Sequence, residues 1–247
     1  MRQVYQWMTA GLAVTTVVAF AVATSPAVQA AIFGNTIVLV LMLVAQFGLV
    51  IALSAAVHKM SGGMATGLFL LYSAVTGATL SSIFVVYPIA SIANAFLVTT
   101  GTFLAMSVYG TVTKRDLTSM GSFLFMGLIG IIIASIVNIF LKSTMMDFVI
   151  SCLGVLIFTG LTAFDTQKLR RFGENAPLED GTAVRRGAIL GALTLYLDFI
   201  NLFLMGLARD KIISWQFGAG GESDMYFAAF VVPDIINYLL AGGFMPR

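Results

Sequence analysis

Residues 195–204 read LYLDFINLFL, and this stretch lies near the middle of an apolar segment that runs from about Gly187 to Leu207. The segment is long enough to cross a lipid bilayer, because a spanning helix needs ~20 predominantly apolar residues. Asp198 is thus a carboxylate inside a membrane segment, where an ionised side chain costs ~2.5–3.5 kcal/mol on insertion scales. We expect Asp198 to face protein or water and to have a polar partner.

The composition of the whole chain is that of a membrane protein. Of its 247 residues, 59% are hydrophobic and only 10% are charged, and the mean hydropathy is +0.99. This length allows about seven spans joined by short loops, and it leaves no room for a soluble domain of ordinary size. The sequence therefore predicts an all-α integral membrane protein built as a bundle of seven transmembrane helices.

The apolar segments place the seven spans along the chain. We expect them at about residues 4–23, 36–57, 64–86, 91–112, 120–141, 146–165 and 187–207. The first segment also resembles a secretory signal peptide, because Arg2 precedes it and Val28-Gln29-Ala30 follows it. Its apolar run is longer than that of a usual signal peptide, which favours a first transmembrane helix.

Two stripes of small residues predict close contacts between helices, since small side chains let neighbouring backbones approach. In the third span the stripe is Ser73, Gly77 and Ser81, and in the fifth it is Gly127, Gly130, Ala134 and Asn138. Asn138 has two interpretations: it either lines a polar pathway or forms a hydrogen bond between helices.

The distribution of Lys and Arg predicts the orientation. With seven spans, nine of the thirteen basic residues fall on one side of the membrane and four on the other. The richer side is expected to be cytoplasmic, which places the N-terminus and the loop of residues 168–186 inside. We divide the chain into a membrane domain, residues 1–210, and a C-terminal extension, residues 211–247, that forms an interfacial, re-entrant or partner-docked helix.

The best candidate partner for Asp198 is Asp165, near the cytoplasmic end of the sixth span. The first five spans contain no acidic residue, and both aspartates can reach the inner half of the membrane. Thr162 shares a helical face with Asp165, while Thr194 and Asn201 share a face with Asp198 by three- and four-residue spacing. The sequence therefore predicts a polar seam between the sixth and seventh spans.

The chemistry of such a pair is that of a proton-sensitive latch. Two carboxylates in contact cannot both stay ionised cheaply, so they tend to share a proton. Without that proton they repel each other and offer oxygen ligands of the type that Ca²⁺ prefers. The alternative is structural: Asp165 pairs with Lys168, and Asp198 forms a hydrogen bond to Asn201 or Thr194.

Several other functions are excluded by what the sequence lacks. The single Cys152 and the single His58 provide neither a disulfide framework nor a metal site with ligand spacing. No basic run interleaved with aromatic residues suggests nucleic-acid binding. Paired membrane aspartates also occur in aspartyl intramembrane proteases, but Leu197-Asp198-Phe199 is not the Gly-rich motif of those enzymes. We therefore expect neither enzymatic activity nor a cofactor.

Three motifs together resemble one known family. They are TKRDL at residues 113–117 with GSFL at 121–124, FDTQ at 164–167, and LYLDFINLF at 195–203. In combination they resemble the Bax inhibitor-1 family, also called the transmembrane Bax inhibitor motif family, from about Val4 to Asp210. The short loops are similar to those of bacterial members, which implies the bacterial cytoplasmic (inner) membrane. The resemblance also implies seven helices with the seventh surrounded by the others.

The resemblance implies a function as well. Family members form a pH-responsive Ca²⁺ leak, and their paired aspartates match Asp165 and Asp198, which would act as pH sensor and as transient Ca²⁺ ligands. The implied partners are the bilayer, Ca²⁺ and protons. A bacterial branch binds a membrane-anchored AAA protease, so the alternative is a regulatory or accessory subunit that binds another membrane protein complex. Residues 211–247 would dock that partner; they have no counterpart in most family members.

Overall fold

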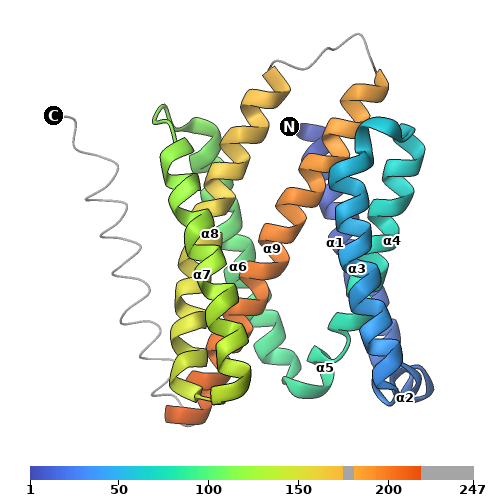
Figure 1. Ribbon diagram of the computed structural model, residues 1–247, viewed down its shortest axis with the longest axis vertical. Coiled ribbons are helices and arrows are strands. Elements are labelled where there is room, and N and C mark those ends of the chain that lie inside the picture. Colours follow the sequence, from blue (N-terminus) through green and yellow to red (C-terminus); the bar gives the residue numbers. More distant parts are fainter. Residues whose placement is uncertain (175–180, 218–247) are drawn as a thin grey trace, which may run out of the picture.

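A computed structural model describes residues 1–174 and 181–217, and each regular element within these ranges is helical (Figure 1). In chain order the elements are α1 (Arg2–Ala23), α2 (Pro26–Phe33), α3 (Thr36–Ala56), η1 (Val57–Lys59), α4 (Gly62–Leu80), α5 (Ile83–Val86), α6 (Ile89–Val112), α7 (Thr118–Leu141), α8 (Thr144–Glu174) and α9 (Gly181–Phe217). Most of the predicted extension, and the middle of the loop of residues 168–186, lie outside the described residues.

The predicted class is confirmed: this is an all-α integral membrane protein, and its described residues form seven helices of membrane-spanning length. The spans are α1, α3, α4 with α5, α6, α7, α8 and α9. The seventh span is central, because 67% of its most apolar stretch is buried, against 6–39% in the other six. In Figure 1, α9 slants between a group formed by α1, α3 and α4 and a group formed by α6, α7 and α8, and it packs on members of both.

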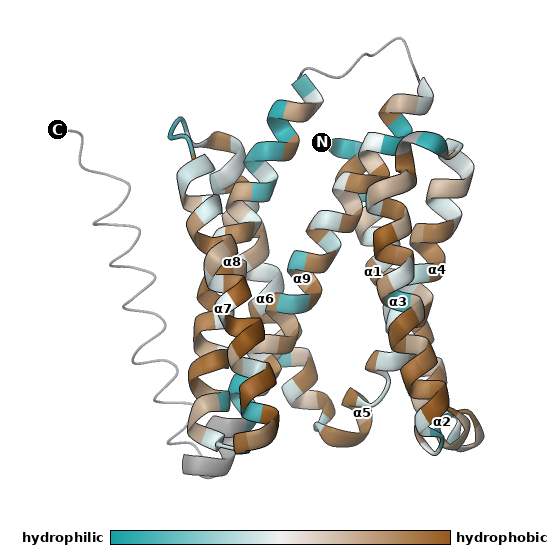
Figure 2. Cartoon of the chain, viewed as in Figure 1, coloured by the Kyte–Doolittle hydropathy of each residue, from teal (hydrophilic) through white to brown (hydrophobic). Residues whose placement is uncertain are grey.

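The outer surface of the bundle is apolar over the middle of its height (Figure 2). Large side chains such as Phe140, Ile89 and Phe47 are 81%, 72% and 71% exposed. Contiguous apolar surface of this kind is unusual on a soluble protein and indicates contact with lipid or with another protein. In Figure 2 most hydrophilic residues lie at the helix ends, chiefly at the end near the N-terminus, and α9 also carries hydrophilic positions within its length.

The structure adds detail that the apolar segments did not indicate. Residues 26–33 form the short helix α2, which begins at Pro26, a residue suited to the first helical turn. The third span is interrupted after Leu80, where the hydroxyls of Ser81 and Ser82 donate to the carbonyls of Ala78 and Thr79. Side chains that bond back to the backbone in this way compete with a regular helix.

Close backbone contacts fix each helix group internally. A Cβ atom on Gly77 of α4 would lie 2.5 Å from the carbonyl oxygen of Thr15 in α1, so the predicted Ser73–Gly77–Ser81 stripe does form a close helix contact. Gly110 of α6 meets the backbone of Ala163 in α8 in the same way. The second stripe is only partly correct: Gly127 contacts Ile157, but Gly130 has nothing within 4 Å of an added Cβ, because that side of α7 faces outward.

Candidate functional site

Asp165 of α8 and Asp198 of α9 face the same cavity. The cavity has a volume of about 530 Å³ and is lined by residues of α7, α8 and α9. Asp198 is only 6% exposed, while Asp165 is half-buried, and their side chains are close enough to interact. The predicted seam between the sixth and seventh spans is therefore present in the fold.

One oxygen of this pair is left without a partner. Oδ2 of Asp198 is buried and accepts no hydrogen bond from any described residue. The charged neighbour of Asp165 is Lys168, one turn along α8, and its ammonium lies 5.9 Å from the centre of the Phe164 ring. A buried carboxylate oxygen with no donor is costly, so a proton, a water molecule or a cation is needed to satisfy it.

The other predicted site residues divide into two groups. Thr194 and Asn201 line the same cavity as the two aspartates, although the Thr194 hydroxyl also donates to the carbonyl of Leu190 at 3.1 Å. Thr162 is fully buried and donates to the carbonyl of Phe158. It is not among the residues that line the cavity of the two aspartates. Thr162 thus supports α8 and does not contact the cavity.

Asn138 lies near the C-terminal end of α7, whereas the α7 residues that line the cavity lie between Gly121 and Leu128, in the N-terminal half of the helix. Its amide nitrogen donates to Asp147 of α8 at 2.5 Å and to the carbonyl of Ser143 at 3.1 Å, and its oxygen accepts from the Ser143 amide. These are the interhelical hydrogen bonds of the second interpretation. Asn138 closes the turn between α7 and α8 rather than lining the cavity.

The face of α9 opposite Asp198 is anchored to α1 by Tyr196, which the sequence did not single out. Residues two apart on a helix point about 200° apart, so Tyr196 and Asp198 face different helix groups. The buried Tyr196 hydroxyl is 2.6 Å from the Thr15 hydroxyl, which donates to the carbonyl of Ser73. The Tyr196 ring also packs edge-to-face on Phe69 and Tyr72. This contact carries no charge, so it holds α9 at any ordinary pH.

Removing the Tyr196 hydroxyl should loosen this anchor. We expect Tyr196→Phe to lower the free energy of unfolding by about 1 kcal/mol, the usual contribution of one buried hydrogen bond. Tyr109→Phe is the matched control, because Tyr109 is 42% exposed on the outside of α6. Reversible unfolding in mixed detergent measures both variants. Equal stabilities for the two would show that the Tyr196–Thr15 contact contributes nothing.

The C-terminal end of α8 is held against the turn between α6 and α7. Gln167, two residues after Asp165, accepts from the Leu117 amide at 3.0 Å and donates to the Arg115 carbonyl at 2.8 Å. Arg171 forms an ion pair with Asp116 at 3.0 Å. Hydrogen bonds from Thr118, followed by the contact with Arg171, hold the pKa of Asp116 below its ordinary value. The TKRDL motif and the FDTQ motif therefore form one contact.

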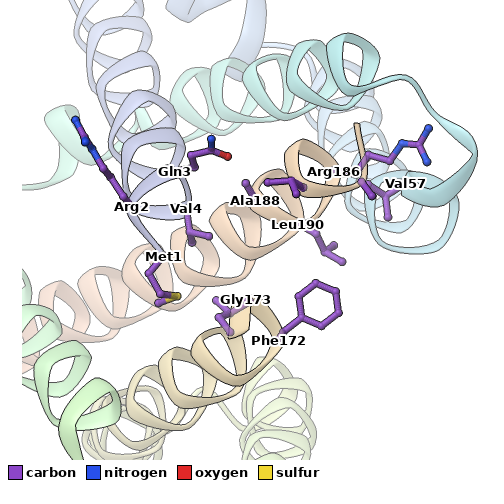
Figure 3. Close-up of a pocket in the computed structure, with 14 residues that line it drawn as sticks. Met1, Arg2, Gln3, Val4, Val57, Phe172, Gly173, Arg186, Ala188 and Leu190 are labelled. Atoms are coloured by element: carbon purple, nitrogen blue, oxygen red, sulfur yellow. The ribbon is translucent and has the colours of Figure 1, made fainter. Parts of the chain in front are cut away.

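A second cavity lies where α1 begins, α8 ends and α9 begins (Figure 3). Its volume is about 480 Å³, and apolar side chains such as Val4, Phe172 and Leu190 line it. Arg2 and Arg186 also border it, and Figure 3 shows their guanidinium groups pointing to opposite sides. Neither predicted aspartate reaches this cavity, so it does not belong to the candidate site.

Comparisons with known proteins agree with this architecture. Residues 1–208 match the family described as "Inhibitor of apoptosis-promoting Bax1". The chain is 56% identical over 205 residues to "Inner membrane protein YbhL" of Escherichia coli (strain K12), covering 83% of this chain and 88% of that protein. It is 51% identical over 205 residues to an uncharacterized protein of Borreliella burgdorferi, with the same coverage of both chains. An uncharacterized protein of Deinococcus radiodurans is 41% identical over 214 residues, covering 85% of this chain and 90% of its own. With its seven-helix bundle and central seventh helix, this chain belongs to the Bax inhibitor-1 family.

Proposed function

We propose that this protein is a pH-sensitive Ca²⁺ leak channel of the bacterial cytoplasmic membrane, gated by Asp165 and Asp198. One observation carries the proposal: Asp198 is 6% exposed, has an unpartnered carboxylate oxygen, and faces the same cavity as a second carboxylate on the adjacent helix. A buried acidic pair in a membrane bundle is expensive to maintain and marks an ion or proton pathway by default. The E. coli relative is named an inner membrane protein, which supports the cytoplasmic membrane as the location.

The gating step follows from the charge of the pair. With one proton shared, the two carboxyl groups attract each other and hold α8 against α9. When the pH rises and the proton leaves, two negative charges face each other in a low-dielectric site and repel. This mechanism gives the direction of the pH dependence: acidification closes the latch, and alkalinisation opens it. The exposed oxygens then attract Ca²⁺, which takes carboxylate and amide oxygens as ligands.

The helix contacts support a particular movement in this mechanism. Because α6 and α8 touch backbone to backbone at Gly110, Asp165 is carried by a rigid unit. Asp198 lies on α9, whose opposite face is bound to α1 through Tyr196. Repulsion between the aspartates thus acts across the contact between α8 and α9, and it separates the two helix groups rather than bending a single helix.

Flux measurements in liposomes test the proposal. The purified full chain is reconstituted with a trapped Ca²⁺ indicator, and Ca²⁺ entry is followed as the pH is raised symmetrically. We expect little flux at acidic pH and a rise on alkalinisation. Protein-free liposomes provide the background. Absence of Ca²⁺ flux at every pH would reject the leak and favour the regulatory alternative, in which the aspartate pair is structural and another membrane protein is the partner.

The proposed orientation, with the N-terminus in the cytoplasm, has its own test. In a Cys152→Ala background, cysteine is introduced at Lys114 or at Lys142, exposed residues at opposite ends of α7. A membrane-impermeant maleimide applied to intact spheroplasts should label the Lys142→Cys protein and spare the Lys114→Cys protein. Both should react after the membrane is permeabilised. The reverse pattern in intact spheroplasts would invert the topology.

A further inference from the structure

The cavity that contains the aspartate pair lacks the ligand set of a resident metal ion, as distinct from one that passes through. Besides Asp165 and Asp198, its polar lining consists of Thr194, Asn201 and Ser122, while six of its lining residues are Phe or Leu. The described part of the chain contains no group of three or more His, Cys, Asp or Glu side chains that could hold a metal ion. A resident Ca²⁺ takes six to eight oxygen ligands, which this lining does not readily provide.

The same walls suit a cation with an apolar body. At about 530 Å³ the cavity falls within the range of ~300–1,000 Å³ found for small-molecule sites, which are mostly apolar with a few placed polar groups. Phe125, Phe158 and Phe164 border it. The ammonium of Lys168 already lies over the Phe164 ring, so one of these aromatic faces accepts a cation in the structure itself.

The polar side chains of the cavity provide acceptors for the N–H donors of an organic ammonium group. A primary ammonium has three N–H donors. The unpartnered Oδ2 of the 94%-buried Asp198 can accept one of them, and Asp165 and Asn201, whose side chains also carry acceptor oxygens, line the same cavity. An ammonium would neutralise the pair as a shared proton does, and it would also satisfy the free oxygen.

The cavity has an approach from the outer surface of the bundle. Phe125 is 58% exposed on α7, and the neighbouring Ser122 is also exposed, whereas Phe158 and Leu161 on the α8 wall are buried. The outer surface of α7 is apolar. The compounds that accumulate beside Ser122 and Phe125 are therefore those that partition into a bilayer.

We propose that the aspartate cavity is a binding site for lipophilic organic amines, whose ammonium group binds Asp198 and Asp165 and whose apolar body lies against the phenylalanine and leucine walls. The inference uses the pair of the proposed function but does not require Ca²⁺ to pass. It adds a chemical class of ligand that bridges α8 and α9 and so favours the closed arrangement.

Calorimetric titration of the purified full chain tests this assignment. The probe is phenylbutylamine at mildly alkaline pH, and phenylbutanol, which has the same apolar body without the charge, controls for partition into detergent. We expect the amine to bind at least about tenfold more tightly than the alcohol. Asp198→Asn should remove this difference, and the exposed loop variant Asp116→Asn should retain it. Equal affinities for amine and alcohol in the unmodified protein would overturn the proposal.

A second variant protects the test against loss of folding in Asp198→Asn. Phe125→Ala truncates an exposed wall residue and should weaken amine binding several-fold while the protein stays monodisperse. Unchanged amine affinity in both Asp198→Asn and Phe125→Ala would contradict the assignment. The leak is judged separately. Amine binding without Ca²⁺ flux supports the ligand site and rejects the channel. Ca²⁺ flux without amine binding supports the channel and rejects the ligand site.

Discussion

Replacing Asp198 by Asn is expected to flatten the pH dependence of Ca²⁺ flux in liposomes. The proposed latch couples opening to the release of one proton, so the open fraction of the unmodified protein should change by up to about tenfold per pH unit. Asn keeps the size and hydrogen-bonding capacity of the side chain but cannot ionise. Repulsion then cannot develop across the α8–α9 contact, and the driving force for opening is lost. Asp165→Asn should act in the same way.

Two further variants make this prediction specific. The double substitution at Asp165 and Asp198 should add little to either single change, because the residues act as one unit. Asp116→Asn removes a carboxylate that pairs with Arg171 in the loop before α7, and it should leave the profile intact. If both single variants at the pair keep the profile of the unmodified protein, the aspartates do not gate the flux.

Gly110→Ala is expected to destabilise the folded protein strongly, by about 2 kcal/mol or more. The added Cβ would collide with the carbonyl oxygen of Ala163, which is a backbone atom and cannot rotate away. Helices α6 and α8 must then separate next to Asp165. Gly101→Ala in the same helix is the matched control, because an added Cβ there meets nothing within 4 Å.

The two alanine substitutions should change the free energy of unfolding in opposite directions. Alanine favours a helix over glycine by ~1 kcal/mol, so Gly101→Ala should be neutral or stabilising, while the same gain at Gly110 is outweighed by the collision. Reversible unfolding in mixed detergent, with retention on size exclusion as a check, compares them. If Gly110→Ala were as stable as Gly101→Ala, the close α6–α8 contact would be absent in the membrane.

The sequence was most informative where composition determines structure. Long apolar segments located all seven spans, since a bilayer requires ~20 apolar residues for each helix. The rarity of acids in those segments singled out Asp165 and Asp198, which the fold places in one cavity. Helix ends were less predictable: α8 continues to Glu174 and α9 runs from Gly181 to Phe217, because polar residues extend helices beyond the apolar region.

Tertiary partners could not be read from the sequence. Tyr196 looks like an ordinary aromatic residue until the fold brings Thr15 to its hydroxyl. Gln167 belongs to the FDTQ motif, but the sequence did not indicate what its side chain does. Its hydrogen-bond partners, Arg115 and Leu117, lie about fifty residues earlier in the chain. Gly130 and Gly110 illustrate the same limit. Small residues permit close packing, but only the arrangement of helices decides which glycine meets a neighbour.

The separation of the two carboxyl groups at acidic and alkaline pH tests the proposed latch most directly. Experimental structures of the unmodified protein in lipid nanodiscs would provide it. We predict carboxyl oxygens of Asp165 and Asp198 within ~2.5–3.0 Å at acidic pH, the distance of a hydrogen bond that shares a proton. At alkaline pH we predict that the oxygens move apart together with α8 and α9. An unchanged separation at both pH values, or side chains that point apart and bond elsewhere, would contradict the latch.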